Sequence, residues 1–511
     1  MSRKRSSVRF VPTLALGAAA YGLAFPPFDY AACAWVALVP LLLAVRGAGT
    51  RRAFVLGLSA GFLSAWAVSW WLAGALARYF DLGWTLGIAG AGVYALVVWG
   101  MPFGLFAAAA ASLLRTPRPL QPVACCIGVG ALWVATELLR GRVMQQPWAL
   151  LGYSQHAHVE LAQLAAVTAV YGLSFVICLG NWAIAEAIVR FRSGDRRAAV
   201  HPLVGVAVVV ALVWFAGDLR VRSGAMGGFE PQPVAIVQAG TRPARVWTRA
   251  FVDRQILAHV RLTTTQLRDT PAALIVWPEH AVPAYPDRDP ALRHLLGEVA
   301  RRHRADLLFG APRSAGGTVY NSVRLVDPSG HERGHYDKQR PVLLAESNPF
   351  APADALADDG NPARFGAGAE ATVLSSFVKL APSVCHEVLF PELVRAAVAA
   401  DAALLVNVSN DAWLDDGAGV ASRQHFAMAR FRAIETDRYL VRAATTGVSG
   451  VIDPRGRILE TAPLGAAAVL VATVPGRHGR TPYVLLGDSF AFACALLAAV
   501  TLVEARRRSA A

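Results

Sequence analysis

Long uncharged stretches alternate with short charged ones over residues 1–217, and one more lies near the C-terminus. The uncharged runs cover residues 11–28, 30–45, 53–77, 82–114, 119–136, 161–185, 198–217 and 489–503. A helix needs about 20 apolar residues, within a range of about 17–25, to cross the hydrocarbon core of a bilayer. The runs at 30–45 and 489–503 need flanking residues to reach this length, and 82–114 is long enough to tilt. The pattern predicts a helical membrane bundle of about eight spans, seven before a large polar region and one after it.

Basic residues gather in alternate loops of this predicted bundle. They lie before the first span, between the second and third, after the fourth, after the sixth and at the C-terminus: Arg3, Lys4, Arg5, Arg9, Arg46, Arg51, Arg52, Arg115, Arg118, Arg190, Arg192, Arg196, Arg197, Arg506, Arg507 and Arg508. The positive-inside rule therefore predicts cytoplasmic termini and places residues 218–485 on the other side of the membrane. The first run also has the basic start and small residues of a signal peptide, whose removal would leave the polar region on that same side.

Between residues 219 and 480 the pattern changes to short β-rich runs bounded by Gly, Pro and Asp. The predicted strands are 233–238, 273–277, 306–311, 322–326, 373–381, 403–408, 439–444 and 468–474. Helical patterns cover 251–268, 290–304 and 422–436. Strands that alternate with helices predict an α/β domain whose sheets are covered by helices. The expected organisation is a seven-span bundle at 1–217, this polar domain at 218–485, and an eighth span with a basic tail at 486–511.

Composition supports the division into apolar and polar parts. Of the 511 residues 55% are hydrophobic and only 16% are charged, against roughly 25% charged in an ordinary soluble domain. Disorder and a fibrous repeat are excluded, and the composition argues against a wholly soluble enzyme. The net charge of +14 would suit a nucleic-acid partner, but much of it lies in the loops that orient the bundle. We therefore expect the membrane, and no nucleic acid, as a partner.

Two charged residues of the polar domain are candidates for chemistry. Glu279 follows Trp277-Pro278 at the end of an apolar run, where a carboxylate can lie at the mouth of a buried strand. Lys338 is one of only three lysines among 49 Lys and Arg residues. A compact ammonium suits a small oxyanion better than a planar guanidinium does. Taken alone, either residue could equally be a solvated surface charge.

The third candidate is a cysteine. Five of the six cysteines lie in apolar stretches, and only Cys385 lies in the polar region, followed directly by His386 and Glu387. A thiol just past a strand can act as a nucleophile if a base or a positive charge is near it. Glu279 could accept the thiol proton, and Lys338 could stabilise both the thiolate and a tetrahedral oxyanion. A single cysteine can also be inert.

Together the three signals carry more weight. The order Glu279, Lys338, Cys385, each near the edge of a β-run, resembles the nitrilase superfamily of carbon–nitrogen hydrolases. Further matches to that superfamily are Tyr320-Asn321-Ser322, Asp327-Pro328, Asn410-Asp411-Ala412-Trp413, Arg432-Ala433-Ile434-Glu435 and Thr446-Gly447-Val448-Ser449-Gly450. The membrane part looks like the apolipoprotein N-acyltransferase family, on Pro147-Trp148-Ala149-Leu150-Leu151-Gly152-Tyr153-Ser154-Gln155, Gln163, Tyr171-Gly172, Ser174-Phe175 and Asn181.

The resemblance implies a multi-pass protein of the bacterial inner membrane with a periplasmic nitrilase-like αββα sandwich. Cys385 would take an acyl chain from a phospholipid, and the N-terminal amine of a diacylglyceryl-cysteine apolipoprotein would then take it from the thioester. Glu279 would act first as base and then as acid, while Lys338 and the backbone N–H of His386 hold the oxyanion. Neither a metal nor a cofactor is implied.

Supporting residues also carry over from the family. Glu346 matches a glutamate on a mobile loop, Glu387 a glutamate two positions after the nucleophile, and Trp247 a tryptophan near the substrate entrance. A salt-bridged carboxylate or a packed aromatic ring is the structural alternative for each. His386 would line the pocket, because neighbouring side chains in extended backbone point to opposite sides and His386 could not then take the proton of Cys385.

The chain departs from the family in three places. The stretch 342–346 lacks the usual Pro and Gly, His386 stands where Tyr is common, and 444–447 lacks an Asn. These departures leave two alternatives open. One is a membrane-tethered amidase or hydrolase in which water replaces the amine. The other is a non-catalytic nitrilase-like protein that serves membrane assembly.

One motif points to chemistry that its context does not support. His331-Glu332-Arg333-Gly334-His335 matches the zinc-protease pattern, which requires a helix so that both histidines share one face. A turn sequence precedes the motif and a glycine interrupts it. In extended chain the histidines would lie roughly 13 Å apart, too far to share one ion.

Overall fold

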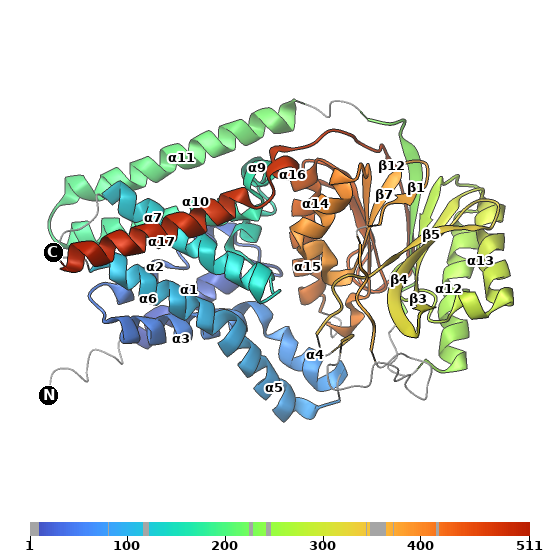
Figure 1. The fold of residues 1–511 in the computed structure, drawn as a ribbon, viewed down its shortest axis with the longest axis horizontal. Coiled ribbons are helices and arrows are strands. Elements are labelled where there is room, and N and C mark those ends of the chain that lie inside the picture. Colours follow the sequence, from blue (N-terminus) through green and yellow to red (C-terminus); the bar gives the residue numbers. More distant parts are fainter. Residues whose placement is uncertain are drawn as a thin grey trace. The chain divides into compact units, whose positions relative to one another are not determined.

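The computed structural model describes residues 10–79, 81–115, 122–223, 228–241, 247–343, 345–347, 364–370, 372–414 and 418–510. It forms two compact units, one of residues 1–224 with 486–511 and one of residues 225–485. Figure 1 shows helices alone in the first unit and two sheets with helices in the second. The basic residues before the first predicted span, together with Arg118 and Leu344, lie outside the described residues.

The first unit is a bundle of apolar helices. Its helices are α1 (Phe10–Leu23), α2 (Val39–Val45), α3 (Thr50–Ser69), α4 (Trp71–Tyr79), α5 (Gly83–Tyr94), α6 (Met101–Leu114), α7 (Pro122–Leu138), α8 (Val159–Ala162), α9 (Ala165–Thr168), α10 (Val170–Arg192), α11 (Arg196–Arg222) and α17 (Ser489–Ala510). The helix α11 continues to Arg222, past the boundary expected at 217. Close packing in the bundle depends on small residues: a Cβ on Gly57 of α3 would lie 2.3 Å from the Phe103 carbonyl oxygen of α6.

Six helical segments among the described residues are long and apolar enough to cross a membrane. They are Thr50–Ser69, Gly83–Leu114, Pro122–Val143, Val170–Arg192, Arg196–Arg222 and Ser489–Arg508. The first two predicted spans correspond to shorter helices, since α1 has 14 residues and α2 has seven. The prediction of a polytopic helical bundle is confirmed, and the count of eight spans is approximate.

The second unit contains two six-stranded sheets. Their strands are β1 (Gln232–Gln238), β2 (Leu274–Val276), β3 (Asp306–Ala315), β4 (Thr318–Val326), β5 (Glu332–Asp337), β6 (Leu374–Ser375), β7 (Lys379–Val384), β8 (Leu404–Ser409), β9 (Leu440–Ala444), β10 (Gly450–Ile452), β11 (Ile458–Thr461) and β12 (Ala468–Val474). One sheet has the order β12-β1-β2-β3-β4-β5 and the other β11-β10-β9-β8-β7-β6. The strands β1, β2 and β3 are parallel, as are β7, β8 and β9.

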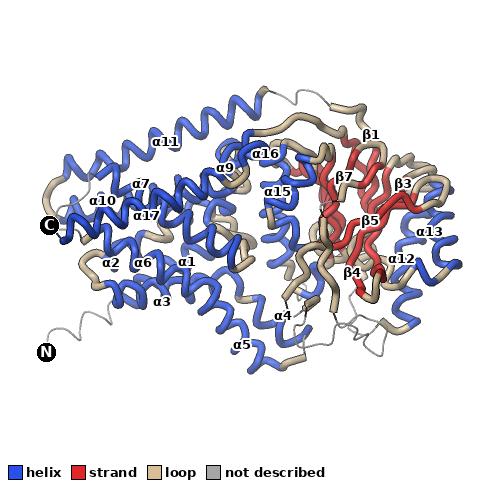
Figure 2. Tube along the Cα trace, viewed as in Figure 1, coloured by secondary structure: helices blue, strands red, loops and turns tan. Residues whose placement is uncertain are grey.

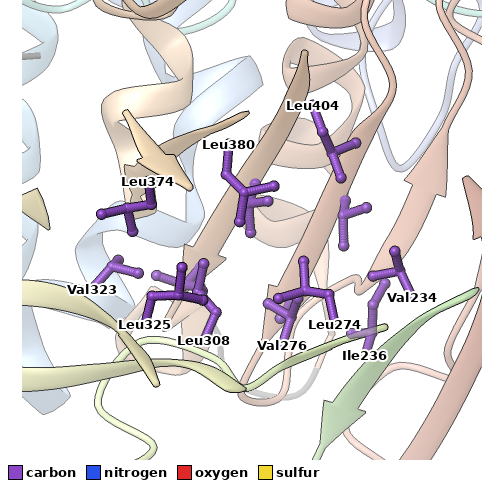
Figure 3. Close-up of a cluster of buried hydrophobic side chains, with 14 of the residues drawn as sticks. Val234, Ile236, Leu274, Val276, Leu308, Val323, Leu325, Leu374, Leu380 and Leu404 are labelled. Atoms are coloured by element: carbon purple, nitrogen blue, oxygen red, sulfur yellow. The ribbon is translucent and has the colours of Figure 1, made fainter. Parts of the chain in front are cut away.

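The two sheets pack face to face around a core of buried apolar side chains. Figure 3 shows Val276 and Leu308 of one sheet facing Leu380 and Leu404 of the other. The helices α12 (Arg249–Gln266) and α13 (Pro290–His303) cover the first sheet, whereas α14 (Pro391–Ala399) and α15 (Val420–Thr436) cover the second (Figure 2). The four layers confirm the predicted αββα sandwich.

Two features of the sheets differ from the sequence prediction. The predicted strand 373–381 is a hairpin, in which Ser376 N–H donates to the Val378 carbonyl oxygen at 3.0 Å and the chain reverses between β6 and β7. The strand β5 was not predicted, because Glu-Arg-Gly-His-Tyr-Asp is polar and lies at the edge of its sheet. The antiparallel pairing with β4 stabilises this segment as a strand, although its own residues do not favour one.

Strand direction determines where the loops meet. The strand β5 is antiparallel to β4, which is antiparallel to β3, so β5 runs parallel to β2 and β3. The chain therefore leaves β2 and β5 at the same edge of one sheet, and it leaves β7 and β8 at a common edge of the other. Functional side chains of α/β proteins gather at such carboxyl ends.

Candidate active site

Glu279 lies three residues beyond the end of β2 and is 3% exposed. One carboxylate oxygen accepts a hydrogen bond from Asn321 Nδ2 at 2.7 Å and lies 3.4 Å from Lys338 Nζ. The other oxygen accepts the backbone N–H of Asn410 at 2.7 Å. These contacts come from the loops after β5 and β8 and from β4. They hold the carboxylate in one orientation.

Lys338 directly follows β5 and is 1% exposed. Its backbone N–H donates to the Asn321 carbonyl oxygen at 2.9 Å, and its ammonium lies 2.7 Å from Glu346 Oε2. Burial by itself lowers the pKa of Lys338, but the carboxylates of Glu279 and Glu346 outweigh burial and hold that pKa above its ordinary value. The ammonium is therefore charged at every physiological pH.

Cys385 ends the straight course of β7 and begins a 3₁₀ turn, Cys385–Leu389. Its φ of +55° lies in the left-handed region, and the side chain is buried. Burial raises the pKa of the thiol, Glu279 raises it further, and Lys338 opposes them. The resting thiol is therefore protonated at neutral pH, and a base must remove its proton when it attacks. Both Glu279 and Lys338 are close enough to Cys385 to influence its charge.

Glu346 belongs to the same cluster. Its carboxylate accepts hydrogen bonds from Asn321 Nδ2 at 2.7 Å and from the Val342 N–H at 2.8 Å, in addition to the ion pair with Lys338. Burial raises the pKa of Glu346, but Lys338 outweighs burial and the pKa is lowered to about 2. Asn321 therefore bridges two carboxylates that flank one ammonium. Its Tyr-Asn-Ser motif was noted in the sequence, whereas its bonding to both carboxylates was not.

Glu387 ties the cysteine turn to the lysine segment. Its carboxylate accepts the N–H groups of Val384 at 2.7 Å, Gln339 at 2.6 Å and Arg340 at 3.0 Å, and the Tyr336 hydroxyl at 3.0 Å. The residue is fully buried, and burial raises the pKa of its carboxyl group. Glu387 thus fixes the distance between the segments that carry Cys385 and Lys338.

The two aromatic candidates lie beside this cluster. His386 is half-buried with its ring 5.5 Å from that of Phe390, and burial lowers its pKa to about 3. The ring of Trp247 lies 5.2 Å from that of His280, which immediately follows Glu279. The premise of extended backbone at Cys385 and His386 was wrong, because the left-handed φ of Cys385 turns the chain there. The His386 imidazole is nevertheless neutral at physiological pH.

Sequence analysis missed a buried polar network behind the nucleophile. Asn407 Nδ2 of β8 donates to the Cys385 carbonyl oxygen at 3.2 Å, and Arg442 of β9 donates to the Asn407 side-chain oxygen. Arg442 also donates to Asp411 Oδ2 at 2.7 Å. Burial raises the Asp411 pKa, but Arg442 and His425 outweigh it and hold that pKa well below its usual range. The signal in the sequence was an arginine inside an apolar strand.

The zinc-like motif adopts no helix. Glu332 to His335 lie within β5, and His331 immediately precedes this strand. The part of the chain that the structure describes holds no group of three or more His, Cys, Asp or Glu side chains that could bind a metal ion.

Comparison with known proteins places both units in described families. The carbon-nitrogen hydrolase family matches residues 233–483, which contain Glu279, Lys338 and Cys385. The N-terminal domain family of apolipoprotein N-acyltransferase matches residues 17–183. The second unit is thus a nitrilase-type domain, and it is joined to a helical domain that belongs to one kind of acyltransferase.

Relatives match nearly the whole chain. An apolipoprotein N-acyltransferase of Geobacter metallireducens is 34% identical over 499 residues, covering 95% of this chain and 93% of the relative. Those of Pseudomonas aeruginosa and Methylococcus capsulatus are 32% and 31% identical, covering 92% and 95% of this chain. The chain belongs to the apolipoprotein N-acyltransferase family. It is a multi-pass membrane protein with a nitrilase-type cysteine enzyme domain.

Proposed function

We propose that this chain transfers a fatty acyl chain from a phospholipid to the N-terminal amine of a diacylglyceryl apolipoprotein, through a thioester on Cys385. The observation that carries the proposal is the Glu279 carboxylate, held by Asn321, Asn410 and Lys338 next to a buried, protonated thiol. This arrangement supplies a base, a fixed positive charge and a nucleophile in one place. The full-length relatives support the choice of substrates.

In the first half-reaction the Cys385 sulfur attacks the ester carbonyl carbon of the phospholipid while Glu279 takes the thiol proton. The charged Lys338 and the backbone N–H of His386 stabilise the oxyanion of the tetrahedral intermediate. When the intermediate collapses, the carbon–oxygen bond breaks and Glu279 returns the proton to the leaving glycerol oxygen. The products are a thioester on Cys385 and a lysophospholipid.

In the second half-reaction the free amine of the apolipoprotein's N-terminal cysteine attacks the thioester. Glu279 accepts a proton from the attacking nitrogen, and the same positive groups stabilise the second oxyanion. Collapse breaks the carbon–sulfur bond, and the proton goes from Glu279 to the Cys385 sulfur. An amide is formed and the thiol is regenerated, so the enzyme returns to its starting state.

Four further residues have supporting roles in this scheme. Glu346 holds the Lys338 ammonium in place, and Glu387 holds the two reacting segments together. His386 lines the pocket with a neutral ring and contributes its N–H. Trp247 is half-buried against His280, and we assign it to the substrate entrance on its match to the family.

The substrates and the charge pattern support a proposed location in the cell. Both substrates are lipid-anchored, so a catalytic domain tethered to a bundle meets them at the membrane. We propose a bacterial inner-membrane protein with both termini cytoplasmic and a periplasmic catalytic domain at 218–485, between a bundle at 1–217 and an eighth span at 486–511. The match of the helical part to an acyltransferase domain favours transfer over a tethered amidase or an assembly role.

A pair of acceptors tests the transfer. The full-length chain is incubated with labelled phospholipid and either a diacylated lipopeptide with a free amine or the same peptide with an acetylated amine. We expect label on the free peptide alone, none with Cys385→Ala, and normal transfer with Cys33→Ala, which changes a cysteine of the helical unit. Release of labelled fatty acid into water with both peptides, or transfer by Cys385→Ala, would overturn the proposal.

A further inference from the structure

A cavity lies in the nitrilase-type unit, where the segment before β1 pairs with the segment after β12. Phe229 N–H donates to the Gly476 carbonyl oxygen at 2.8 Å, and Gly228 pairs with Arg477 in an isolated bridge. The incoming and outgoing chains therefore run side by side at this point. The cavity has a volume of about 500 Å³, and its lining includes none of the residues assigned to acyl transfer.

The lining of this cavity is cationic. Its charged side chains are Lys379, Arg438, Arg477, Arg480 and Asp401. Four cations thus face one carboxylate, which is exposed and lies 3.5 Å from Arg480. The charged side chains that line the cavity therefore carry a net charge of +3.

Arg438 shows the imbalance most clearly. Its guanidinium is buried and donates to the carbonyl oxygens of residues 402, 436, 437 and 479, so that among the described residues it bonds to no carboxylate. Carbonyl oxygens satisfy its donors but leave its charge unneutralised. Burial lowers the pKa of Arg438 to about 10 even though Asp437 raises it, and Arg477 adds to the lowering. Burial is the main cause of this shift, and the neighbouring guanidinium of Arg477 acts in the same direction.

The other three cations differ in their exposure. Arg477 is buried and pairs with Asp437, a carboxylate that also pairs with Arg455. Lys379 is exposed at the start of β7, and Arg480 is about half exposed. These two side chains can turn toward a ligand at the mouth of the cavity, where the aromatic ring of Phe229 is also exposed.

Two short chain segments connect this cavity to apolar helices of the other unit. Phe229 is seven residues beyond the end of α11 at Arg222, and Arg480 is nine residues before α17 begins at Ser489. Fully extended chain spans at most about 3.6 Å per residue, which limits these tethers to roughly 25 Å and 32 Å. Both helices are long and apolar enough to cross the membrane. With their ends at the membrane surface, as the proposed placement has it, the tethers limit how far the cavity can lie from the bilayer.

We propose that this cavity binds the phosphate-bearing headgroup of an anionic phospholipid, at a place separate from the acyl-transfer site. Guanidinium and ammonium groups are the donors that proteins use for phosphate oxygens. The short tethers favour a membrane lipid over a soluble phosphate as the source of that group. The inference rests on the proposed membrane placement, and it does not depend on the acyl-transfer chemistry.

Binding is measured on the full-length chain in neutral detergent, with Cys385→Ala present throughout so that no acyl group is consumed. Calorimetric titration compares dihexanoyl phosphatidylglycerol, dihexanoyl phosphatidylcholine and inorganic phosphate alone. Lys379→Gln with Arg480→Gln removes the two exposed cations. Arg293→Gln with Arg302→Gln removes two exposed cations from α13 as the matched control.

We expect phosphatidylglycerol to bind more tightly than phosphatidylcholine. The cavity variant should weaken this binding about 30-fold, at about fivefold for each charge removed, and the α13 control should leave it unchanged. Equal loss in the control, or no loss in the cavity variant, would overturn the site. Inorganic phosphate that binds as tightly as the lipid and displaces it would show a free-anion site and overturn the lipid assignment. Because the nucleophile is absent, failure of acyl transfer would leave these outcomes unaffected.

Discussion

Cys385 occupies a backbone conformation that favours glycine. Its φ of +55° places it in the left-handed region, which costs an L-residue roughly 1–2 kcal/mol. A hydrogen bond offsets part of this cost: Asn407 Nδ2 donates to the Cys385 carbonyl oxygen at 3.2 Å. Arg442 in turn donates to the Asn407 side-chain oxygen. The turn ends β7 at Cys385, whose thiol pKa is influenced by both Glu279 and Lys338.

A comparison of two substitutions tests this strain. Cys385→Ala removes the reactive group with little loss of packing and should fold normally. Cys385→Gly should be more stable than Cys385→Ala by about 1 kcal/mol, because glycine adopts the left-handed conformation without a steric penalty. Thermal unfolding in detergent measures the difference. A glycine variant clearly less stable than the alanine variant would argue that the turn is unstrained.

The residues that we propose to react could be named from the sequence, but their contacts could not. Glu279 and Cys385 were recognisable because each follows a run of strand-forming residues, and Lys338 because lysine is rare in this chain. The hydrogen bond from Asn410 to Glu279 joins positions 131 residues apart, and the one from Asn321 joins positions 42 apart. Such pairings depend on how strands are ordered in two sheets, which no local pattern records.

Glu387 connects the turn after β7 to the segment after β5. Its two carboxylate oxygens receive three backbone N–H groups and one hydroxyl. Buried donors that lose their acceptor cost roughly 1–3 kcal/mol each, so the stability of both segments depends on one side chain. A surface salt bridge would have had a much smaller effect.

Truncation of this side chain should therefore be costly. We expect Glu387→Ala to destabilise the nitrilase-type unit by about 3 kcal/mol, since water can reach some of the orphaned donors. Glu460→Ala, on the exposed strand β11, serves as the control and should change stability by about 0.5 kcal/mol or less. Unfolding monitored by near-ultraviolet circular dichroism compares them. Equal stability of both variants would show that Glu387 does not link the segments.

Prediction of the elements succeeded where the apolar pattern was strong. The strand β12 has the predicted bounds 468–474, and α13 begins at the predicted residue, Pro290, behind the capping Asp289. The prediction failed for strands that form only because a neighbouring strand pairs with them. The two-residue strand β6 exists only through its hairpin with β7, and polar β5 only through its ladder with β4.

The nitrilase-type unit as a whole should be sensitive to acid. His259 of α12 is fully buried against Trp277, and burial lowers its pKa to about 4. Burial also lowers the pKa of His425, and Arg442 lowers it further. Both imidazoles are neutral in the folded chain but take up protons in the unfolded chain below about pH 6.5. Stability present above that pH is therefore lost as the pH falls toward the folded-state pKa values.

The expected loss is measurable. At pH 5 a histidine with the pKa of His259 contributes about 2 kcal/mol less to folding stability than at pH 7.5. Replacing His259 with Leu should remove that part of the acid sensitivity, so the difference in unfolding free energy between pH 7.5 and pH 5 should shrink by about this amount. An unchanged difference in the variant would mean that His259 is not buried in its neutral form.

The site and the family relationship together lead to one covalent species, an acyl thioester on Cys385. Its most direct test is peptide mapping by mass spectrometry after the full-length chain is mixed with phospholipid and no acceptor. We predict one acyl group on the peptide that contains Cys385, removed by hydroxylamine and by a lipopeptide with a free amine. An adduct on another residue, or none on a chain that still acylates the lipopeptide, would contradict the mechanism.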